Sequence, residues 1–437
     1  MAIGQTDSIN EKASLKRLRR RTVIGLATGN ILEWYDFAVY SSLASILGAL
    51  FFDSTNPLVG LLATFSVFAV GYLARPIGAI VFGRLADLRG RRFTLILVVT
   101  LMGIGTVAMG VLPTYQSVGV LAPILMVLAR IVQGLSVGGE FGTVTAYLVE
   151  IAPNGHRGLY GSIIYFTTGL GFALGLGLIY GFNNVLGEET MHSWGWRVPF
   201  LLSVPLLMLG VYLRKRTEES PAYVALVRAN EVDQAPIKST VKHEWRSMGH
   251  VFGMIIVFTF ISYAVLSFVL SYIIVILKDP VSTAYPVVLT GTVIGACLIP
   301  LAGLASDRFG RRPVLIFGCV LVAVVAVPAF LLLQHGGFVA LLAGLLLLWL
   351  PNAIFSGVCP ATFCELFPAN LRSTSVGLPV AFATAIFSGT TPLVLTFLVD
   401  KTGNNTVPAA YLILGAIVSF GFMWRLRENS KRELANT

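Results

Sequence analysis

Charged residues are scarce in this 437-residue chain, where only 12% of residues are Asp, Glu, Lys or Arg. A soluble globular domain carries about 25%. Hydrophobic residues make up 56% of the chain, and the mean hydropathy is +0.81. This composition excludes an ordinary soluble domain and indicates a chain that lies mainly in lipid.

Cysteine is also rare, and histidine avoids the middle of the apolar runs. All four cysteines lie inside such runs, a pattern that suits packing rather than a disulfide framework or a zinc site. No Gly-Lys pair occurs, which excludes the usual phosphate-binding loop of ATP-driven proteins. The sequence therefore predicts no metal and no cofactor. It offers no nucleophile–base set either, so we do not expect an enzyme.

Long apolar runs are the main feature that is present. Each run is long enough to cross a bilayer core. Since backbone polar groups in lipid need partners within the chain, the runs predict α-helices and an all-α membrane protein. We expect twelve transmembrane helices, at about 23–50, 60–82, 93–112, 119–148, 158–182, 198–213, 249–277, 285–304, 314–334, 338–363, 373–399 and 407–424.

The net charge of +10 comes from basic residues that cluster in the segments expected on one side of the membrane. If the N-terminus is cytoplasmic, 26 of the 31 basic residues fall in cytoplasmic segments. Only Arg197, Lys278 and Lys401 fall outside, while Arg75 and Arg130 lie in or at the edge of runs. This positive-inside pattern predicts a multi-pass membrane protein with both termini cytoplasmic. We expect the membrane to be a bacterial inner membrane. The pattern indicates contact with lipid head groups rather than with nucleic acid.

The chain also repeats itself. The loop GRLADLRGRR (Gly83–Arg92) matches GLASDRFGRR (Gly303–Arg312), and EIAPNGHR (Glu150–Arg157) matches ELFPANLR (Glu365–Arg372). Two six-helix halves in the same orientation place these pairs at equivalent corners. We therefore expect a cytoplasmic segment at 1–22, a first bundle at 23–213, a cytoplasmic linker at 214–248, a second bundle at 249–424 and a cytoplasmic tail at 425–437. We expect the protein to be a monomer.

The paired loops resemble those of the major facilitator superfamily. Within it, the segments GNILEWYDF, RPIGAIVFGRLADLRGRR, RIVQGLSVGGEFG, SWGWRVPF and SDRFGRRPVL resemble the metabolite:proton symporter family, over about residues 20–425. The resemblance implies a midplane site between the halves and a latch that breaks when the inner gate opens. As an alternative to this latch, the arginines of the paired loops serve only to set the orientation of the chain in the membrane. The expected gating residues are Asp87, Arg91, Asp307, Arg311, Glu140, Glu150, Arg157, Glu365 and Arg372.

Three charged residues of the first half are predicted at one membrane depth. Glu33 lies eleven residues into its run, about 16 Å at 1.5 Å per residue. Asp36 follows about one turn later on nearly the same face. Arg130 lies equally deep in the run 119–148. Since a charge at mid-bilayer is costly, we expect the three to meet.

Two interpretations of these charges stay open. In one, Glu33 or Asp36 forms a structural ion pair with Arg130. In the other, an acid carries a proton, and its protonation frees Arg130 to bind a substrate anion, so that proton and substrate bind together. We favour the second, with Asp36 as the proton site and Glu33 as the structural partner.

Further polar residues fall within the apolar runs and are either interface residues or substrate ligands. With Arg130, the candidates for substrate binding are Asn30, Tyr40, Gln133, Tyr165, Thr168, Tyr263, Tyr272 and Asn352. The run 158–182 also carries small residues at spacings that favour close helix packing, namely Gly169, Gly171, Gly175, Gly177 and Gly181.

The expected function is proton-coupled import of a small organic acid, such as a di- or tricarboxylate like citrate, by alternating access. The buried arginine favours an anion. The main alternative is symport of a zwitterionic osmolyte such as proline or betaine, since a quaternary ammonium needs an aromatic cage and aromatic residues are plentiful. A proton-antiport drug exporter is a third possibility, against which the buried arginine argues.

Overall fold

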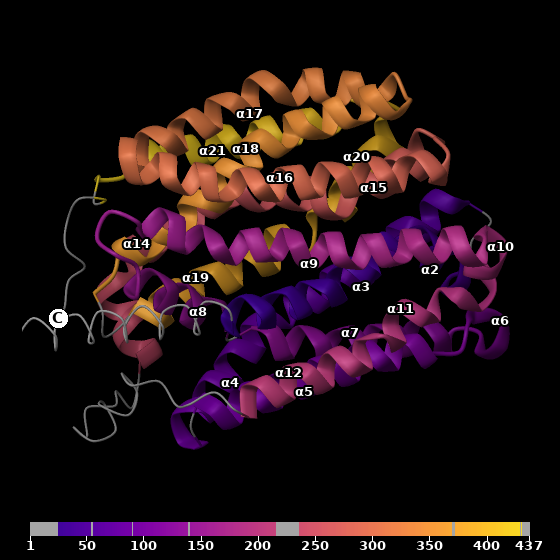
Figure 1. The fold of residues 1–437 in the computed structure, drawn as a ribbon, viewed down its shortest axis with the longest axis horizontal. Helices are drawn as coiled ribbons and strands as arrows, with labels where there is room; N and C mark the ends of the chain where they lie inside the picture. The colour runs from indigo at the N-terminus through magenta and orange to yellow at the C-terminus, as the bar shows by residue number, and fades with distance from the viewer. Residues whose placement is uncertain are drawn as a thin grey trace, which may run out of the picture.

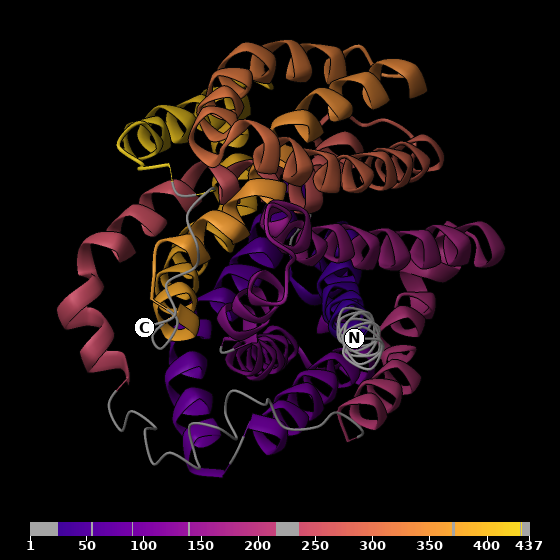
Figure 2. The same cartoon turned by 60° about the vertical axis from the view of Figure 1, so that its left-hand side comes forward.

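The computed structural model describes residues 25–53, 56–89, 91–138, 140–215, 236–368, 372–428 and 430. Within these residues the chain is helical and contains no strand. Figures 1 and 2 show two bundles, one indigo to magenta and one orange to yellow, with α9 lying where they meet. The all-α fold predicted from the sequence is confirmed.

The first bundle opens with a helix at 25–42. The helices that follow are α2 (Ala44–Phe51), α3 (Pro57–Leu73), α4 (Arg75–Arg89), α5 (Arg91–Val111), α6 (Tyr115–Val118), α7 (Leu121–Val137), α8 (Glu140–Glu150), α9 (Arg157–Leu186), α10 (Glu188–Thr190), η1 (Met191–Gly195), α11 (Arg197–Leu201) and α12 (Ser203–Lys215). Two expected spans are locally interrupted. One interruption is at Ala74 between α3 and α4, where the backbone keeps helical dihedral angles, and the other is beside Gly138 between α7 and α8.

The second bundle contains long helices interrupted by π-helical turns. They are α14 (Pro236–Tyr263), η2 (Ala264–Phe268), α15 (Val269–Ser271), η3 (Tyr272–Ile276), α16 (Val281–Phe309), α17 (Arg311–Gln334), α18 (Phe338–Glu365), α19 (Arg372–Ala383), η4 (Thr384–Ser388), α20 (Thr391–Thr402) and α21 (Val407–Trp424). π-turns are often found where a helix contributes to a functional site. Here η2 and η4 both reach the cavity described below.

Membrane-spanning helices account for most of the described chain. Eight are long and apolar enough to span by themselves: Pro57–Phe82, Arg157–Leu186, Glu244–Ile276, Val281–Phe309, Arg311–Gln334, Phe338–Glu365, Arg372–Thr402 and Val407–Trp424. Three shorter apolar helices and the first helix occupy the remaining expected spans, so the twelve-helix arrangement is consistent with the structure. The linker expected at 214–248 differs in extent, because α14 already begins at Pro236, while 216–235 lie outside the described residues.

Helix α9 packs against both bundles through its small residues. A side chain at Gly169 would collide with Ala296 of α16, at 2.6 Å. On another side of α9, side chains at Gly171 and Gly175 would collide with the helix at 25–42. The close packing predicted for this glycine-rich run is therefore confirmed at these three positions. Helix α9 connects the first helix of one bundle to α16 of the other.

Candidate functional site

A cavity lies between the two bundles and contains about 1100 Å³ of space, counting its open mouth. The first bundle contributes the helix at 25–42, α4, α7, α8 and α9. The second bundle contributes α14, η2, α16, α18, α19 and η4. A wall built from both bundles changes shape whenever the bundles move relative to one another. This is the arrangement that alternating access requires.

Six of the residues singled out in the sequence line this cavity: Asn30, Glu33, Tyr165, Thr168, Tyr263 and Asn352. Asn30 donates to the Ile164 carbonyl oxygen and to Thr167 Oγ1, both at 2.8 Å, which fixes the first helix to α9. In the second bundle, Ser262 donates to Asn352 Oδ1 at 2.6 Å. These polar groups are therefore oriented before any ligand binds.

Asp36 and Arg130 lie behind the wall of the cavity and are joined by two neutral side chains. Thr106 donates to Asp36 Oδ2 at 2.9 Å, Gln133 Nε2 donates to Thr106 Oγ1 at 2.9 Å, and Arg130 Nη1 donates to Gln133 Oε1. Asp36 is 5% exposed and Arg130 2%. A direct Asp36–Arg130 ion pair, one of the expected alternatives, is not formed. Thr106 was not singled out in the sequence, because a threonine in an apolar run is unremarkable there.

Arg130 also stacks on aromatic rings. Its guanidinium carbon lies 3.5 Å from the centre of the Tyr40 ring and 5.3 Å from that of Phe68. Such cation–π contacts partly compensate a buried positive charge. Tyr40 donates its hydroxyl to the Thr64 carbonyl oxygen at 2.9 Å. Tyr40 and Gln133, both expected to bind substrate, therefore support Arg130 instead of lining the cavity.

Arg75 is the basic residue that lines the cavity, and the sequence did not single it out as a site residue. It begins α4 directly after the interruption at Ala74, and Pro76 follows it. A side chain at Gly138 would lie 2.0 Å from the Arg75 carbonyl oxygen, so the absence of a side chain there lets α4 approach α7 closely. In the sequence, the only indication of this role is that Arg75 is a charged residue at the start of the apolar segment RPIGAIVF. The direction in which its side chain points depends on the interruption of the helix at Ala74, which the sequence does not reveal.

The Arg75 guanidinium lies against aromatic rings. Its carbon lies 3.7 Å from the centre of the Tyr72 ring and 4.8 Å from that of Phe37. The side chain is 6% exposed, and its Nε and Nη2 make no hydrogen bond. Two further buried donors on the wall also have no partner, Trp349 Nε1 and Ser388 Oγ.

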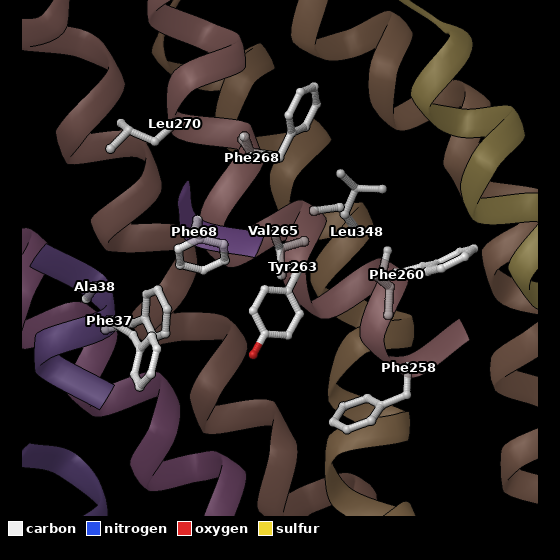
Figure 3. Packing of buried hydrophobic residues seen from close by; sticks show 14 of the residues in the cluster. Phe37, Ala38, Phe68, Phe258, Phe260, Tyr263, Val265, Phe268, Leu270 and Leu348 are labelled. Carbon is white, nitrogen blue, oxygen red and sulfur yellow. The ribbon is translucent and has the colours of Figure 1, made fainter. Parts of the chain in front are cut away.

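Aromatic side chains form much of the wall: Trp34, Phe141, Tyr165, Phe258, Tyr263 and Trp349. Figure 3 shows Tyr263 between Phe37 of the first bundle and Phe258 of its own. The Tyr263 and Tyr72 hydroxyl oxygens lie 2.7 Å apart and hydrogen-bond the two bundles together. Tyr272, another expected ligand, instead donates to the Asn405 carbonyl oxygen at 2.8 Å.

Ion pairs join the bundles at the end where α9 and α19 begin. Arg372 Nη1 lies 2.6 Å from Glu150 Oε1, and Arg157 Nη1 lies 3.9 Å from Glu365 Oε1. Glu150 and Glu365 are equivalent in the repeat, as are Arg157 and Arg372. Each acid therefore pairs with the arginine of the opposite bundle.

Asp307 extends this contact between the bundles. Its carboxylate accepts hydrogen bonds from the backbone N–H groups of Gly158 at 2.8 Å and Leu159 at 3.0 Å, at the N-terminus of α9. Such positions favour negative charge, because the first N–H groups of a helix lack partners within it. Arg311 binds Asp307 at 2.9 Å and Glu365 at 3.0 Å. The side chains of Asp87, Arg91 and Glu140 lie outside the described residues.

Two helical bundles around a shared central cavity define a membrane transporter of the major facilitator type, as the paired loops predicted. The family model for sugar (and other) transporters matches residues 22–436. The chain belongs to this family.

Solved structures share the fold. The xylose transporter XylE of E. coli, in a partially occluded inward-open conformation, superposes with a TM-score of 0.74 at 20% identity, over 95% of this chain and 99% of that one. A crystal structure of a D-xylose–proton symporter gives 0.72 at 21% identity, over 94% and 98%.

Three relatives are named as transporters of proline together with betaine or ectoine. The glycine betaine/proline/ectoine/pipecolic acid transporter OusA of Dickeya dadantii is 34% identical, over 95% of this chain and 84% of that protein. The proline/betaine transporter of Escherichia coli strain K12 is 34% identical, over 95% and 85%. The ectoine/proline transporter ProP of Corynebacterium glutamicum is 32% identical, over 95% and 85%.

Proposed function

We propose that this protein imports a small zwitterion, of the proline or betaine type, together with protons. The observation that carries the proposal is the charge of the cavity wall, where the described residues supply one acid, Glu33, and one base, Arg75. A zwitterion complements that pair. A di- or tricarboxylate would bring two or three negative charges to one base and one acid, so the organic acid first expected is less well supported.

The aromatic wall supports the same choice. A quaternary or secondary ammonium group binds favourably over aromatic faces, and Trp34, Tyr165 and Phe258 offer such faces on the wall. The relatives named above transport substrates of this kind, which supports the alternative stated from the sequence. A cation exporter is less well supported, since Arg75 would repel its substrate.

Asp36 is the proposed site of the coupled proton. An ionised Asp36 attracts Arg130 across Thr106 and Gln133, and protonation removes that attraction. Glu33 and Asn30 lie on the same helix as Asp36 but face the cavity. A shift of this helix on protonation therefore reaches the substrate. Proton and substrate then favour each other's binding, which is the thermodynamic meaning of symport.

Alternating access requires that one end of the cavity opens while the other closes. The ion pairs of Glu150, Arg157, Glu365 and Arg372 are proposed to close one end. The distribution of basic residues assigns this end to the cytoplasm. At the opposite end, the Tyr285 hydroxyl donates to the Ser42 carbonyl oxygen at 2.9 Å, a contact between the bundles that has to break for outward opening.

The test is transport by the purified protein in proteoliposomes with an inward proton gradient. We expect accumulation of radiolabelled proline or betaine that stops when a protonophore collapses the gradient. Citrate and 2-oxoglutarate serve as comparison substrates. Gradient-driven accumulation of either acid, without accumulation of a zwitterion, would overturn the proposal in favour of the organic acid. Substrate-driven proton export would indicate antiport instead.

A further inference from the structure

We propose that Arg75 binds the carboxylate of the transported zwitterion, with Trp349 and Ser388 of the second bundle as additional hydrogen-bond donors. This inference rests on the function proposed above and assigns its substrate-binding groups. It also assigns Arg130 a different role, that of a partner in proton coupling behind the cavity wall.

These donors have no hydrogen-bond partner in the fold. Trp349 is 1% exposed and Ser388 is fully buried, yet neither Trp349 Nε1 nor Ser388 Oγ makes a hydrogen bond. The Nε and Nη2 of Arg75 are in the same condition. Buried polar groups in folded proteins are nearly always hydrogen-bonded, so a group of exceptions on one cavity wall requires an explanation. A ligand rich in acceptors supplies the missing partners.

The guanidinium of Arg75 suits a carboxylate. In any arginine, the Nε–H and Nη2–H bonds point from the same edge in parallel directions. This edge matches the two oxygens of one carboxylate in a bidentate pair. Contacts with the rings of Tyr72 and Phe37 restrict the Arg75 side chain, so little side-chain freedom is lost on binding.

The unpaired donors come from both bundles. Arg75 begins α4, whereas Trp349 lies in α18 and Ser388 ends η4. The residue after Ser388, Gly389, approaches Tyr72 so closely that an added side chain would lie 2.5 Å from the Tyr72 Cβ. This contact places the end of η4 beside the ring on which Arg75 stacks. A carboxylate held there binds the bundles together.

Arg130 provides the contrast. Its Nε and Nη2 also have no partner, but Arg130 does not line the cavity, and its guanidinium lies on Tyr40 behind the wall. A substrate carboxylate in the cavity therefore meets Arg75 first. Replacement of Arg130 is expected to alter proton coupling, and replacement of Arg75 to alter recognition of the carboxylate.

The experiment compares binding of proline with binding of prolinamide, which lacks the carboxylate, to purified full-length protein by isothermal titration calorimetry. Prolinamide is expected to bind the wild type weakly. Arg75→Gln should weaken proline binding on the order of 10- to 150-fold, the range for a lost hydrogen bond to a charged group. It should leave prolinamide nearly unchanged, so that the preference for proline collapses. Arg246→Gln, which alters an exposed arginine away from the cavity, is the matched control and should keep that preference.

Two further variants keep the proposal testable if Arg75→Gln does not fold. Trp349→Phe and Ser388→Ala each remove one donor with little change of shape, and each should lower the preference for proline several-fold. Trp424→Phe, at an exposed site outside the cavity, controls for the loss of an indole. An unchanged preference in the folded Arg75 variant, or in both donor variants, overturns the assignment. If the wild type binds citrate but neither proline nor betaine, the proposed function itself has failed.

Discussion

Asp36 and Arg130 do not touch, yet a continuous chain of hydrogen bonds through Thr106 and Gln133 connects them. A chain of this kind transmits a change of charge without an ion pair, because each neutral side chain reorients when its neighbour gains or loses a proton. In the proposed mechanism, this chain couples Asp36 to Arg130 while Asp36 remains able to release its proton. A direct ion pair would hold the carboxylate ionised more strongly.

Asp36→Asn should abolish proton-driven accumulation while equilibrium binding of substrate survives. The amide imitates the protonated acid but cannot release a proton on the far side of the membrane. Exchange of internal for external substrate should persist, since it needs no net proton release. The measurement is uptake against exchange in proteoliposomes under an imposed pH gradient. Normal proton flux with concentrative uptake in this variant would remove Asp36 from coupling. An exchange-only phenotype in Glu33→Gln would transfer the role to Glu33.

Arg130→Lys should reduce the coupled uptake rate strongly while the protein still folds. A lysine ammonium keeps the charge, but it cannot stack flat on Tyr40 and donate to Gln133 in the same way. The readouts are the initial uptake rate and the thermal midpoint of the purified variant. Uptake close to that of the wild type would show that the charge alone suffices, and that the planar contacts to Tyr40 and Gln133 have no part in coupling.

At the scale of elements, the start of α17 depends on a distant residue. Gly310 precedes this helix with φ +98° and has no side chain with which to cap it. Glu428 instead accepts hydrogen bonds from the backbone N–H groups of Arg311 at 3.1 Å and Arg312 at 2.9 Å. Partial burial alone would raise the pKa of Glu428, but the hydrogen bonds from Ser430, Arg312 and Arg311 outweigh it and lower that pKa.

Glu428→Gln should therefore lower the stability at pH 7 by about 1 kcal/mol, as is typical for loss of a helix cap. The sign with pH follows from the lowered pKa. The carboxylate stabilises the fold above its unfolded-state pKa of about 4.3, and this contribution is lost as the pH falls through the lower folded-state value. Thermal midpoints of variant and wild type should differ at pH 7. The difference should shrink below the unfolded-state pKa of about 4.3 and vanish only below the lower folded-state pKa. A difference independent of pH would contradict the role assigned to the charge.

The ion pair between Glu150 and Arg372 joins the end of α8 to the start of α19. Each single charge reversal should change the rate of cycling far more than the affinity for substrate, because the pair lies at the mouth of the bundles rather than on the cavity wall. The double variant Glu150→Arg with Arg372→Glu should recover part of the lost rate. Transport rates and equilibrium binding of the three variants provide the measurement. No recovery in the double variant would indicate that the two residues act independently.

The sequence predicted much of the fold and part of the site, for physical reasons that differ. Apolar length and the repeated loops depend only on composition and spacing, so the helices and the two halves were predictable. Glu33 and Asp36 were found because carboxylates in apolar runs are costly. Arg75 was missed because the direction of its side chain depends on the interruption of the helix at Ala74 and on the close approach of Gly138 to the Arg75 backbone. Tyr272 was expected to bind substrate, but its hydroxyl binds a loop carbonyl, a contact that no spacing predicts.

For the whole molecule, the orientation in the membrane stays a prediction from the distribution of basic residues. Reporter fusions after Trp424 and within the loop that follows α20, after Gly403, test it. A fluorescent reporter that folds only in the cytoplasm should be active in the first fusion. A phosphatase that is active only outside should be active in the second. The reverse pattern would contradict both the orientation and the assignment of the ion-pair end to the cytoplasm.

The crosswise ion pairs have a consequence for the origin of the molecule. In an isologous contact, residue i of one copy meets residue j of the other, and j meets i. The two ion pairs, Glu150 with Arg372 and Glu365 with Arg157, obey this rule. The repeat makes Glu150 equivalent to Glu365 and Arg157 equivalent to Arg372, so each pair is the counterpart of the other. Two copies of a single six-helix unit would form both bonds from one glutamate and one arginine. In a single chain the two halves need not be identical: one bond is 2.6 Å long, and the other, whose acid is shared with Arg311, is 3.9 Å.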